Sequence, residues 1–293
     1  MTKENDLSAP VASAEARRVC QGPVMPIGGA EDKRAGGEIL ERFVDLAGGK
    51  DARIAIVPTA SEEAAESGEQ YIKVFRELGA GEADWLRIEQ RPDASGEAAL
   101  RLLGEATGIF ITGGDQARLV SLIAGTASME CIRRRNAEGV VVGGTSAGAS
   151  ILPAHLMSGE NPLPENSNDA AARKGMVTLV AGFGLLQDVI VDQHFSQRGR
   201  LGRLLAVYAA NPGLLGVGLD EDTAVLITRD GTLEVLGSGM VTIINGRNAV
   251  SDYYEREVGE VLTVVDSHLF ALGPGRRFDL DARRPIGIGD GAG

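Results

Sequence analysis

Residues 140–149 read VVVGGTSAGA, a β-branched run that ends in two glycines and continues into small residues. The valines favour a strand, the glycines a tight turn, and the alanines the start of a helix. A G-x-S-x-G nucleophile elbow requires this order of strand, turn and helix. Ser146 would then point its Oγ beyond the carboxyl end of the strand, and the Ala147 amide would donate to a developing oxyanion. We interpret Ser146 as a candidate nucleophile, and the alternative is a structural glycine turn.

A second glycine turn ends the neighbouring predicted strand, where residues 109–116 read IFITGGDQ. The amide of Gly113 or Gly114 could complete an oxyanion hole, and we select Gly114. Gln116 follows at a position from which it could hold substrate. Glycines often end strands for structural reasons alone, so this turn indicates a site only together with Ser146.

Outward from these turns, short β-branched runs alternate with segments of helical periodicity. This alternation is typical of a mostly parallel sheet with helices on both faces. The expected strands of the first half are residues 24–27, 53–57, 84–88, 108–112 and 140–142, and the expected helices include 37–46 and 62–78. After residue 215, short strands at 224–228, 233–236, 240–244 and 262–265 are separated by Asp-Gly and Asn-Gly turns. Such dipeptides mark hairpins, so we predict an α/β fold with antiparallel C-terminal strands added to the same sheet.

The domain organisation follows from length and composition. The 293 residues, 43% of them hydrophobic, can bury a full core, and no linker divides them. We predict one catalytic domain over residues 21–283, between a flexible leader at 1–20 and a flexible tail at 284–293. The polar segment 158–174 fits neither strand nor helix and is either a substrate loop or disordered.

The formal charge of −12 argues against nucleic acid or an anionic membrane as a partner, because either would repel this surface. No apolar run reaches the length of about 18 residues expected of a membrane span. The two cysteines, Cys20 and Cys131, are too few for a disulfide framework and fit a reducing compartment. We therefore expect a cytoplasmic protein.

Three histidines are candidates for a general base. His194 follows the apolar run 189–191 and so ends a predicted strand, where open α/β sheets place their ligand crevice. His155 lies about two and a half helical turns beyond Ser146 and would face away. His268 falls in a late hairpin and is expected to face solvent. These positions favour His194.

Charged groups flank this candidate base. One carboxylate of Asp220, Glu221 and Asp222, which follow another predicted strand, could orient the imidazole and stabilise its charged form. The alternative is an ordinary acidic turn. After His194 come three arginines, which form either a solvated helix face or a bidentate grip on carboxylates: Arg198, Arg200 and Arg203.

Taken together, several motifs resemble those of the cyanophycinase family over about residues 22–275. They are IGGAEDK at 27–33, TGGDQ at 112–116, GGTSAGA at 143–149, DQHF at 192–195 followed by RGRLGR at 198–203, and GLDEDTA at 218–224. The GTSAGA element is shared with peptidase E, a related aspartyl dipeptidase. The DQHF element followed by R-x-R-x-x-R points to the cyanophycinases.

This resemblance implies a fold like that of class I glutamine amidotransferases, no metal or other cofactor, and a homodimer. It implies a substrate, cyanophycin, which is a polyaspartate whose side-chain carboxylates carry arginine in isopeptide linkage and which is cut to β-Asp-Arg dipeptides. Carried over by position, Ser146 would be the nucleophile, His194 the base and Glu221 the third member. Apart from this resemblance, Glu160 in the segment 158–174 could compete with Glu221 as the acid. The substrate site would be lined by Gln116, Asp192, Gln193, Arg198, Arg200 and Arg203.

Three alternatives stay open. A peptidase E-like enzyme would cut Asp-X dipeptides. An α/β-hydrolase esterase would use Ser146, then Asp220 or Asp222, then His268 in chain order, although no HGGG-like loop accompanies them. A binding protein could keep the fold without catalysis.

Overall fold

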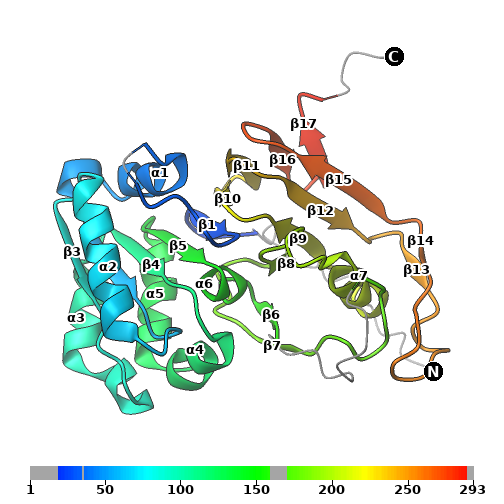
Figure 1. The fold of residues 1–293 in the computed structure, drawn as a ribbon, viewed down its shortest axis with the longest axis horizontal. Helices are drawn as coiled ribbons and strands as arrows, with labels where there is room; N and C mark the ends of the chain where they lie inside the picture. The colour runs from blue at the N-terminus through cyan, green and yellow to red at the C-terminus, as the bar shows by residue number, and fades with distance from the viewer. Residues whose placement is uncertain (1–18, 35, 159–169, 289–293) are drawn as a thin grey trace, which may run out of the picture.

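The computed structural model describes residues 19–34, 36–158 and 170–288. Two main sheets lie side by side, and most helices surround the larger one (Figure 1). Across the nine-stranded sheet the order is β17 (Arg284–Ile286), β16 (Arg277–Asp279), β11 (Thr232–Gly237), β10 (Thr223–Ile227), β1 (Val24–Ile27), β5 (Val141–Thr145), β4 (Gly108–Ile111), β2 (Arg53–Val57) and β3 (Glu82–Trp85). The four-stranded sheet has the order β15 (His268–Leu272), β12 (Val241–Asn245), β9 (Leu215–Leu219) and β8 (Val189–Asp192).

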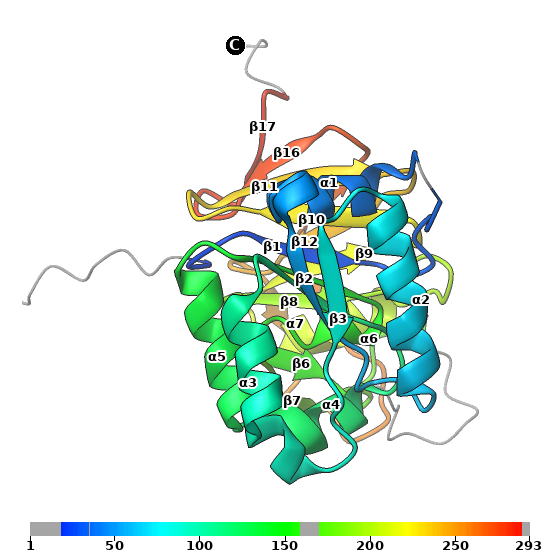
Figure 2. The ribbon, with the colours of Figure 1, turned by 90° about the vertical axis from the view of Figure 1, so that its left-hand side faces the viewer.

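The part of the larger sheet from β1 to β3 is parallel throughout. Strands β1, β4 and β5 are buried along their whole length, because helices cover both faces of a parallel sheet. One face carries α1 (Glu38–Leu46) and α2 (Ala64–Glu77), and the other carries α3 (Glu97–Glu105), α4 (Gln116–Ile123) and α5 (Ala127–Ala137) (Figure 2). The continuous apolar runs seen in the sequence reflect this double burial.

Beyond β1, the strands β10, β11, β16 and β17 extend the larger sheet in antiparallel fashion. The turn between β10 and β11 contains Asp230 and Gly231, and Gly231 has a φ of +78°, which glycine adopts without strain. The predicted fold class is confirmed: a parallel sheet flanked by helices, with antiparallel strands added from the C-terminal third.

The four-stranded sheet corrects one prediction. We expected residues 240–244 to join the main sheet, but β12 pairs with β9 and β15 instead. Strand β9 in turn pairs in parallel with β8. Alternating hydrophobicity identifies a strand and its buried face, whereas it does not select the neighbouring strand. The prediction of a single sheet was therefore wrong.

The remaining elements are short 3-10 helices at Gly49–Asp51 and Arg91–Ser95, helices α6 (Ala147–Ser150) and α7 (Leu201–Ala210), and the strand pairs β6 (His155–Met157) with β7 (Leu179–Ala181) and β13 (Val250–Ser251) with β14 (Val264–Val265). We had assumed a longer helix after Ser146, but α6 is one turn, and His155 instead begins β6. The predicted strand at 84–88 starts earlier, as β3. We placed the start of a flexible tail at Arg284, whereas β17 orders the first residues of that segment. None of the described helices is long and apolar enough to cross a membrane.

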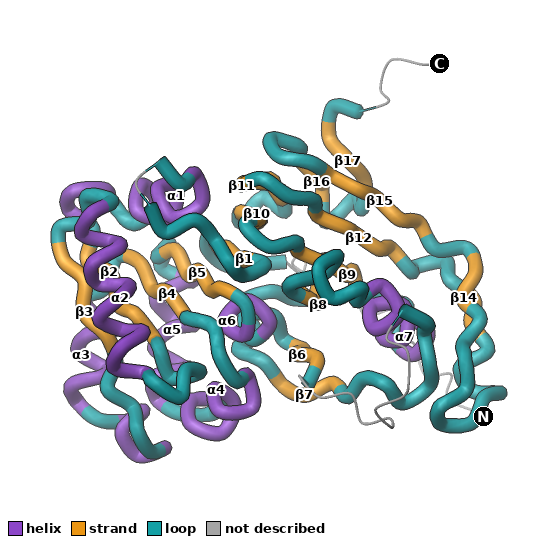
Figure 3. Tube along the Cα trace, viewed as in Figure 1, coloured by secondary structure: helices purple, strands orange, loops and turns teal. Residues whose placement is uncertain are grey.

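The two main sheets share one core. A single cluster of buried side chains includes Val142 of β5, Val217 of β9 and Ile243 of β12. Helix α7 lies beside the smaller sheet (Figure 3). Its Leu204 and Tyr208 belong to a buried cluster with Ile190 of β8 and Ile244 of β12. The shared core fixes the strand ends of the two sheets next to each other.

Candidate active site

The candidate nucleophile lies where strand ends of both sheets meet. Ser146 directly follows β5, and its amide donates to the carbonyl of Ile27, the last residue of β1, at 3.0 Å. Its φ of 53° and ψ of −117° form a combination that L-residues rarely adopt and that costs about 1–3 kcal/mol. The strained residue forms the sharp turn between β5 and α6.

Glycines on either side make this turn possible. A Cβ at Gly144 would lie 2.3 Å from the Gly148 carbonyl oxygen, and a Cβ at Gly148 would lie 2.2 Å from the Ile111 carbonyl oxygen. Real Cβ atoms do not approach backbone so closely. The small residues of the sequence motif are therefore required by packing around Ser146.

His194 contacts the candidate nucleophile. Its Nε2 lies 3.0 Å from Ser146 Oγ, and the side chain is 12% exposed. Its backbone is left-handed, with φ 47°, and its amide donates to Gly28 O at 2.9 Å. A Cβ at Gly29 would lie 2.4 Å from the imidazole Cε1, so a glycine at that position makes room for the ring.

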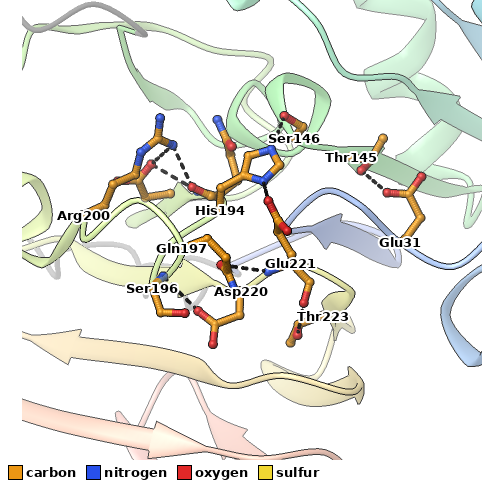
Figure 4. A network of polar contacts seen from close by, with 12 residues as sticks. Glu31, Thr145, Ser146, His194, Ser196, Gln197, Arg200, Asp220, Glu221 and Thr223 are labelled. Carbon is orange, nitrogen blue, oxygen red and sulfur yellow. Dashed lines mark hydrogen bonds and ion pairs between the residues drawn. The ribbon is translucent and has the colours of Figure 1, made fainter.

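Glu221 completes a relay of side chains. Its Oε1 lies 2.6 Å from His194 Nδ1, and its amide donates to the side chain of Gln197 at 3.1 Å (Figure 4). A carboxylate at this distance holds the imidazole in the tautomer whose Nε2 can accept the proton of Ser146.

The neighbouring acids have other partners. Asp220 accepts the amides of Ser196 at 3.0 Å and Met240 at 3.2 Å. Asp222 accepts the amide of Asp32 at 3.0 Å and the hydroxyl of Ser238 at 2.6 Å. Of the three adjacent acids left open by the sequence, only Glu221 contacts the imidazole in the part of the chain that the structure describes.

Two other histidines and one acid do not contribute to this geometry. His155 is exposed at the start of β6, and His268 is exposed on β15, where it pairs with Asn245 across the strands. Glu160, the alternative acid, lies in the segment 159–169, outside the described residues.

Two glycine-containing turns surround the candidate nucleophile. A Cβ built on Gly113 would lie 3.6 Å from Ser146 Oγ, so the second glycine turn borders the serine. The selected Gly114 follows with φ 138°, and Ala147 is the first residue of α6. Neither of these two amides has a hydrogen-bond acceptor among the residues described.

The arginines that follow His194 divide into two kinds. Arg198 is exposed, as expected for a solvated face. Arg200 and Arg203 are 7% and 6% exposed and surround the buried Asp192. Arg200 Nη1 lies 3.1 Å from Asp192 Oδ1, and Arg203 Nε lies 3.5 Å from Oδ2. The alternative of a solvated helix face is wrong for these two arginines.

Burial dominates the electrostatics of this cluster. It raises the pKa of the Asp192 carboxyl, and the guanidiniums of Arg203 and Arg200 oppose that rise. Burial likewise lowers the pKa of Arg200. Arg200 also donates to the Gln193 carbonyl at 2.7 Å, which fixes the chain directly before His194. Two guanidiniums against one carboxylate leave a net positive charge.

Some polar atoms of this region have no hydrogen-bond partner among the described residues. They include Gln193 Oε1 and Arg203 Nε, although this Nε is within ion-pair distance of Asp192 Oδ2, at 3.5 Å. Gln116, by contrast, donates its side-chain amide to the Met157 carbonyl. Buried polar atoms are nearly always satisfied in native proteins, so the unpaired ones suggest a ligand or water at this place.

Residues 24–235 match the model of the family described as Peptidase family S51. The chain belongs to peptidase family S51. This S51 chain is 42% identical to the cyanophycinase of Synechococcus elongatus, over 89% of this chain and 80% of that protein. It is 39% identical to the cyanophycinase of Geminocystis herdmanii, over 90% and 95% of the two chains.

A solved structure agrees in fold. The peptidase from an acI-B1 Actinobacterium superposes with a TM-score of 0.63 at 21% identity, covering 89% of this chain and 97% of that one. At this identity the likeness concerns the fold alone.

Some residues of the site were missed by sequence reasoning. Gly28 and Gly29 support His194, and Gln197 holds the backbone of Glu221. The motif at 27–33 was visible as a resemblance without an assigned role, and it was the available signal for the two glycines. Nothing in the sequence singled out Gln197 from other polar residues of its loop.

Proposed function

We propose that this S51 chain is a serine peptidase that hydrolyses cyanophycin to β-Asp-Arg dipeptides. The observation that carries the proposal is the relay from Ser146 Oγ through His194 to Glu221, with distances of 3.0 Å and 2.6 Å. The similarity to proteins named cyanophycinase supports the choice of substrate.

In the proposed reaction, Ser146 Oγ attacks the carbonyl carbon of a main-chain amide while His194 Nε2 takes the hydroxyl proton. Glu221 stabilises the imidazolium that forms. The amides of Gly114 and Ala147 donate to the oxyanion, which stabilises the transition state more than the ground state. His194 then protonates the leaving amine, and water hydrolyses the acyl-enzyme by the same steps in reverse.

Recognition of the substrate is assigned to the cluster around Asp192. Cyanophycin carries a free carboxylate on each arginine unit, and the net positive charge of Arg200 and Arg203 suits such a group. Arg203 Nε, which has no hydrogen-bond partner among the described residues, gives this carboxylate a donor. Arg198, being exposed, can contact a second carboxylate of the polymer. The net charge of −12 elsewhere suits the guanidinium groups of cyanophycin.

The function is tested by product analysis. Purified protein is incubated with cyanophycin and, separately, with an Asp-X dipeptide, and the products are separated by chromatography and identified by mass. We expect β-Asp-Arg dipeptides from the polymer. Cleavage of the dipeptide alone would contradict the proposal and favour a peptidase E-like enzyme. The esterase alternative has lost its support, since the exposed His268 lies on β15, away from Ser146.

The role of Glu221 gives a quantitative prediction. Glu221→Gln keeps the shape of the side chain but allows the wrong imidazole tautomer, so kcat should fall by about 10⁴. The matched control is Glu160→Gln, the same change at the competing acid, which should leave kcat near the wild-type value. Steady-state kinetics on cyanophycin distinguish them, and a fully active Glu221→Gln beside an inactive Glu160→Gln would reverse the assignment.

Two further features stay predictions. A cytoplasmic location is consistent with two free, buried thiols, Cys20 and Cys131, since a reducing compartment keeps cysteines unpaired. Burial raises the pKa of Cys20 to about 12, so this thiol is unreactive at neutral pH. The homodimer rests on the family resemblance.

A further inference from the structure

The end of β1 and the loop after it contact both the nucleophile and the base. The carbonyl of Ile27 accepts the Ser146 amide at 3.0 Å, and the next carbonyl, of Gly28, accepts the His194 amide at 2.9 Å. One short stretch of backbone therefore holds the serine from the nine-stranded sheet and the histidine from the four-stranded sheet.

The same loop contacts the acid side of the relay. Gly29 O accepts the amide of Asp222 at 2.8 Å, and the amide of Asp32 donates to the Asp222 side chain at 3.0 Å. Asp222 directly follows Glu221 in the chain. The spacing of the three relay members thus depends on where this loop sits.

One side chain ties the loop to the nucleophile turn. Glu31, with a side chain only 1% exposed, accepts a hydrogen bond from the hydroxyl of Thr145 (Figure 4). It accepts a second one from the hydroxyl of Tyr71. Lys33 Nζ lies 3.1 Å from the same carboxylate. Burial and the Glu31 carboxylate raise the pKa of Tyr71 well above its ordinary value, so its hydroxyl stays protonated and donates. Thr145 is the last residue of β5 and immediately precedes Ser146.

Stability alone does not account for this arrangement. Removing a carboxylate from water costs several kcal/mol, and replacing a buried ion pair by apolar side chains of similar volume is often neutral or stabilising. Glu31 is nevertheless buried, and its carboxylate contacts Thr145, Tyr71 and Lys33. Because Thr145 directly precedes Ser146, a movement of Thr145 also moves Ser146. In addition to packing, the Glu31 carboxylate fixes the distance between the loop after β1 and the turn that contains Ser146.

We propose that Glu31 is a positioning residue for the nucleophile, which acts by holding the Thr145 hydroxyl and so keeps Ser146 in register with His194. This proposal deepens the proposed function and rests on the role of Ser146 as nucleophile. Losing the contact lets the strained turn relax, and a displacement of about 1 Å at a reacting atom can cost about a hundredfold in rate.

The test is the rate at which a fluorophosphonate probe labels Ser146, because labelling requires the relay but not cyanophycin. Thr145→Val keeps the shape and removes the hydroxyl, and we expect labelling to slow about tenfold to a hundredfold. On cyanophycin, kcat should fall by a similar factor with KM nearly unchanged. Thr145→Ser, which restores the hydroxyl, should recover both rates.

The matched control is Thr126→Val, the same change at another buried threonine, whose hydroxyl donates to Ile123 O at 2.7 Å between α4 and α5. It should lower the melting temperature and leave labelling unchanged. Labelling of Thr145→Val at the wild-type rate would overturn the proposal. If Thr145→Val does not fold, Glu31→Gln is tested instead, because it keeps the side-chain volume but replaces an acceptor by a donor. We expect the same slower labelling, and labelling at the wild-type rate would again overturn the proposal. A wild-type protein that is not labelled at Ser146 would instead contradict the proposed function.

Discussion

Replacing Ser146 by alanine is expected to lower kcat on cyanophycin by about 10⁶ while the fold stays intact. The unusual backbone at this position, with φ 53°, is no worse for alanine than for serine, because both carry a Cβ. The variant loses only the Oγ that lies 3.0 Å from His194. Turnover and the circular dichroism spectrum, measured on the same sample, separate loss of chemistry from loss of structure.

A matched control lies one turn further along the chain. Ser150 is the last residue of α6 and 3% exposed, so Ser150→Ala makes the same deletion beside the site but outside the relay. It should retain near wild-type kcat. If Ser146→Ala kept more than about a tenth of the wild-type turnover, far above what removal of a nucleophile leaves, Ser146 would not be the nucleophile.

His194→Ala is expected to lower kcat by nearly as much, about 10⁶, because nucleophile and base act as a unit. The left-handed backbone is accessible to alanine, although less favoured than for histidine, and we expect the loop to keep its hydrogen bond to Gly28. His268→Ala is the control, since that histidine is exposed on β15. An inactive His268→Ala beside an active His194→Ala would restore the α/β-hydrolase alternative.

The local features of the site were predictable from the sequence. Ser146 and His194 each follow a buried strand, and the carboxyl ends of strands are where open sheets form crevices. The residues themselves reduced the acid only to three adjacent carboxylates, and the family resemblance selected Glu221 from them. The hydrogen bonds of Asp220 and Asp222 to backbone amides, which exclude those two, depend on loops distant in the sequence.

Other features lay beyond sequence reasoning for a physical reason. Arg200 and Arg203 are buried because they pair with Asp192 at the end of β8. From the sequence alone, the same arginines are equally consistent with a solvent-exposed helix face. The division into two sheets depends on the pairing of β12 with β9. Which strands pair is determined by the tertiary fold and not by the local sequence pattern. Local features such as strands, turns and helix starts can be predicted directly from the sequence. Which strands pair and which side chains come into contact depends on the whole fold.

The division of the relay between the two sheets bears on how the protein gains activity during folding. Ser146 follows a strand of the nine-stranded sheet, whereas His194 and Glu221 follow strands of the four-stranded sheet. Under the proposed mechanism, neither sheet alone can catalyse the reaction, however completely its strands have formed. Contacts between residues distant in sequence form late, because closing long loops costs entropy before the contacts stabilise them. Hydrolysis therefore reports the docking of the two sheets, and loosening of their shared core abolishes it before the strands themselves unfold.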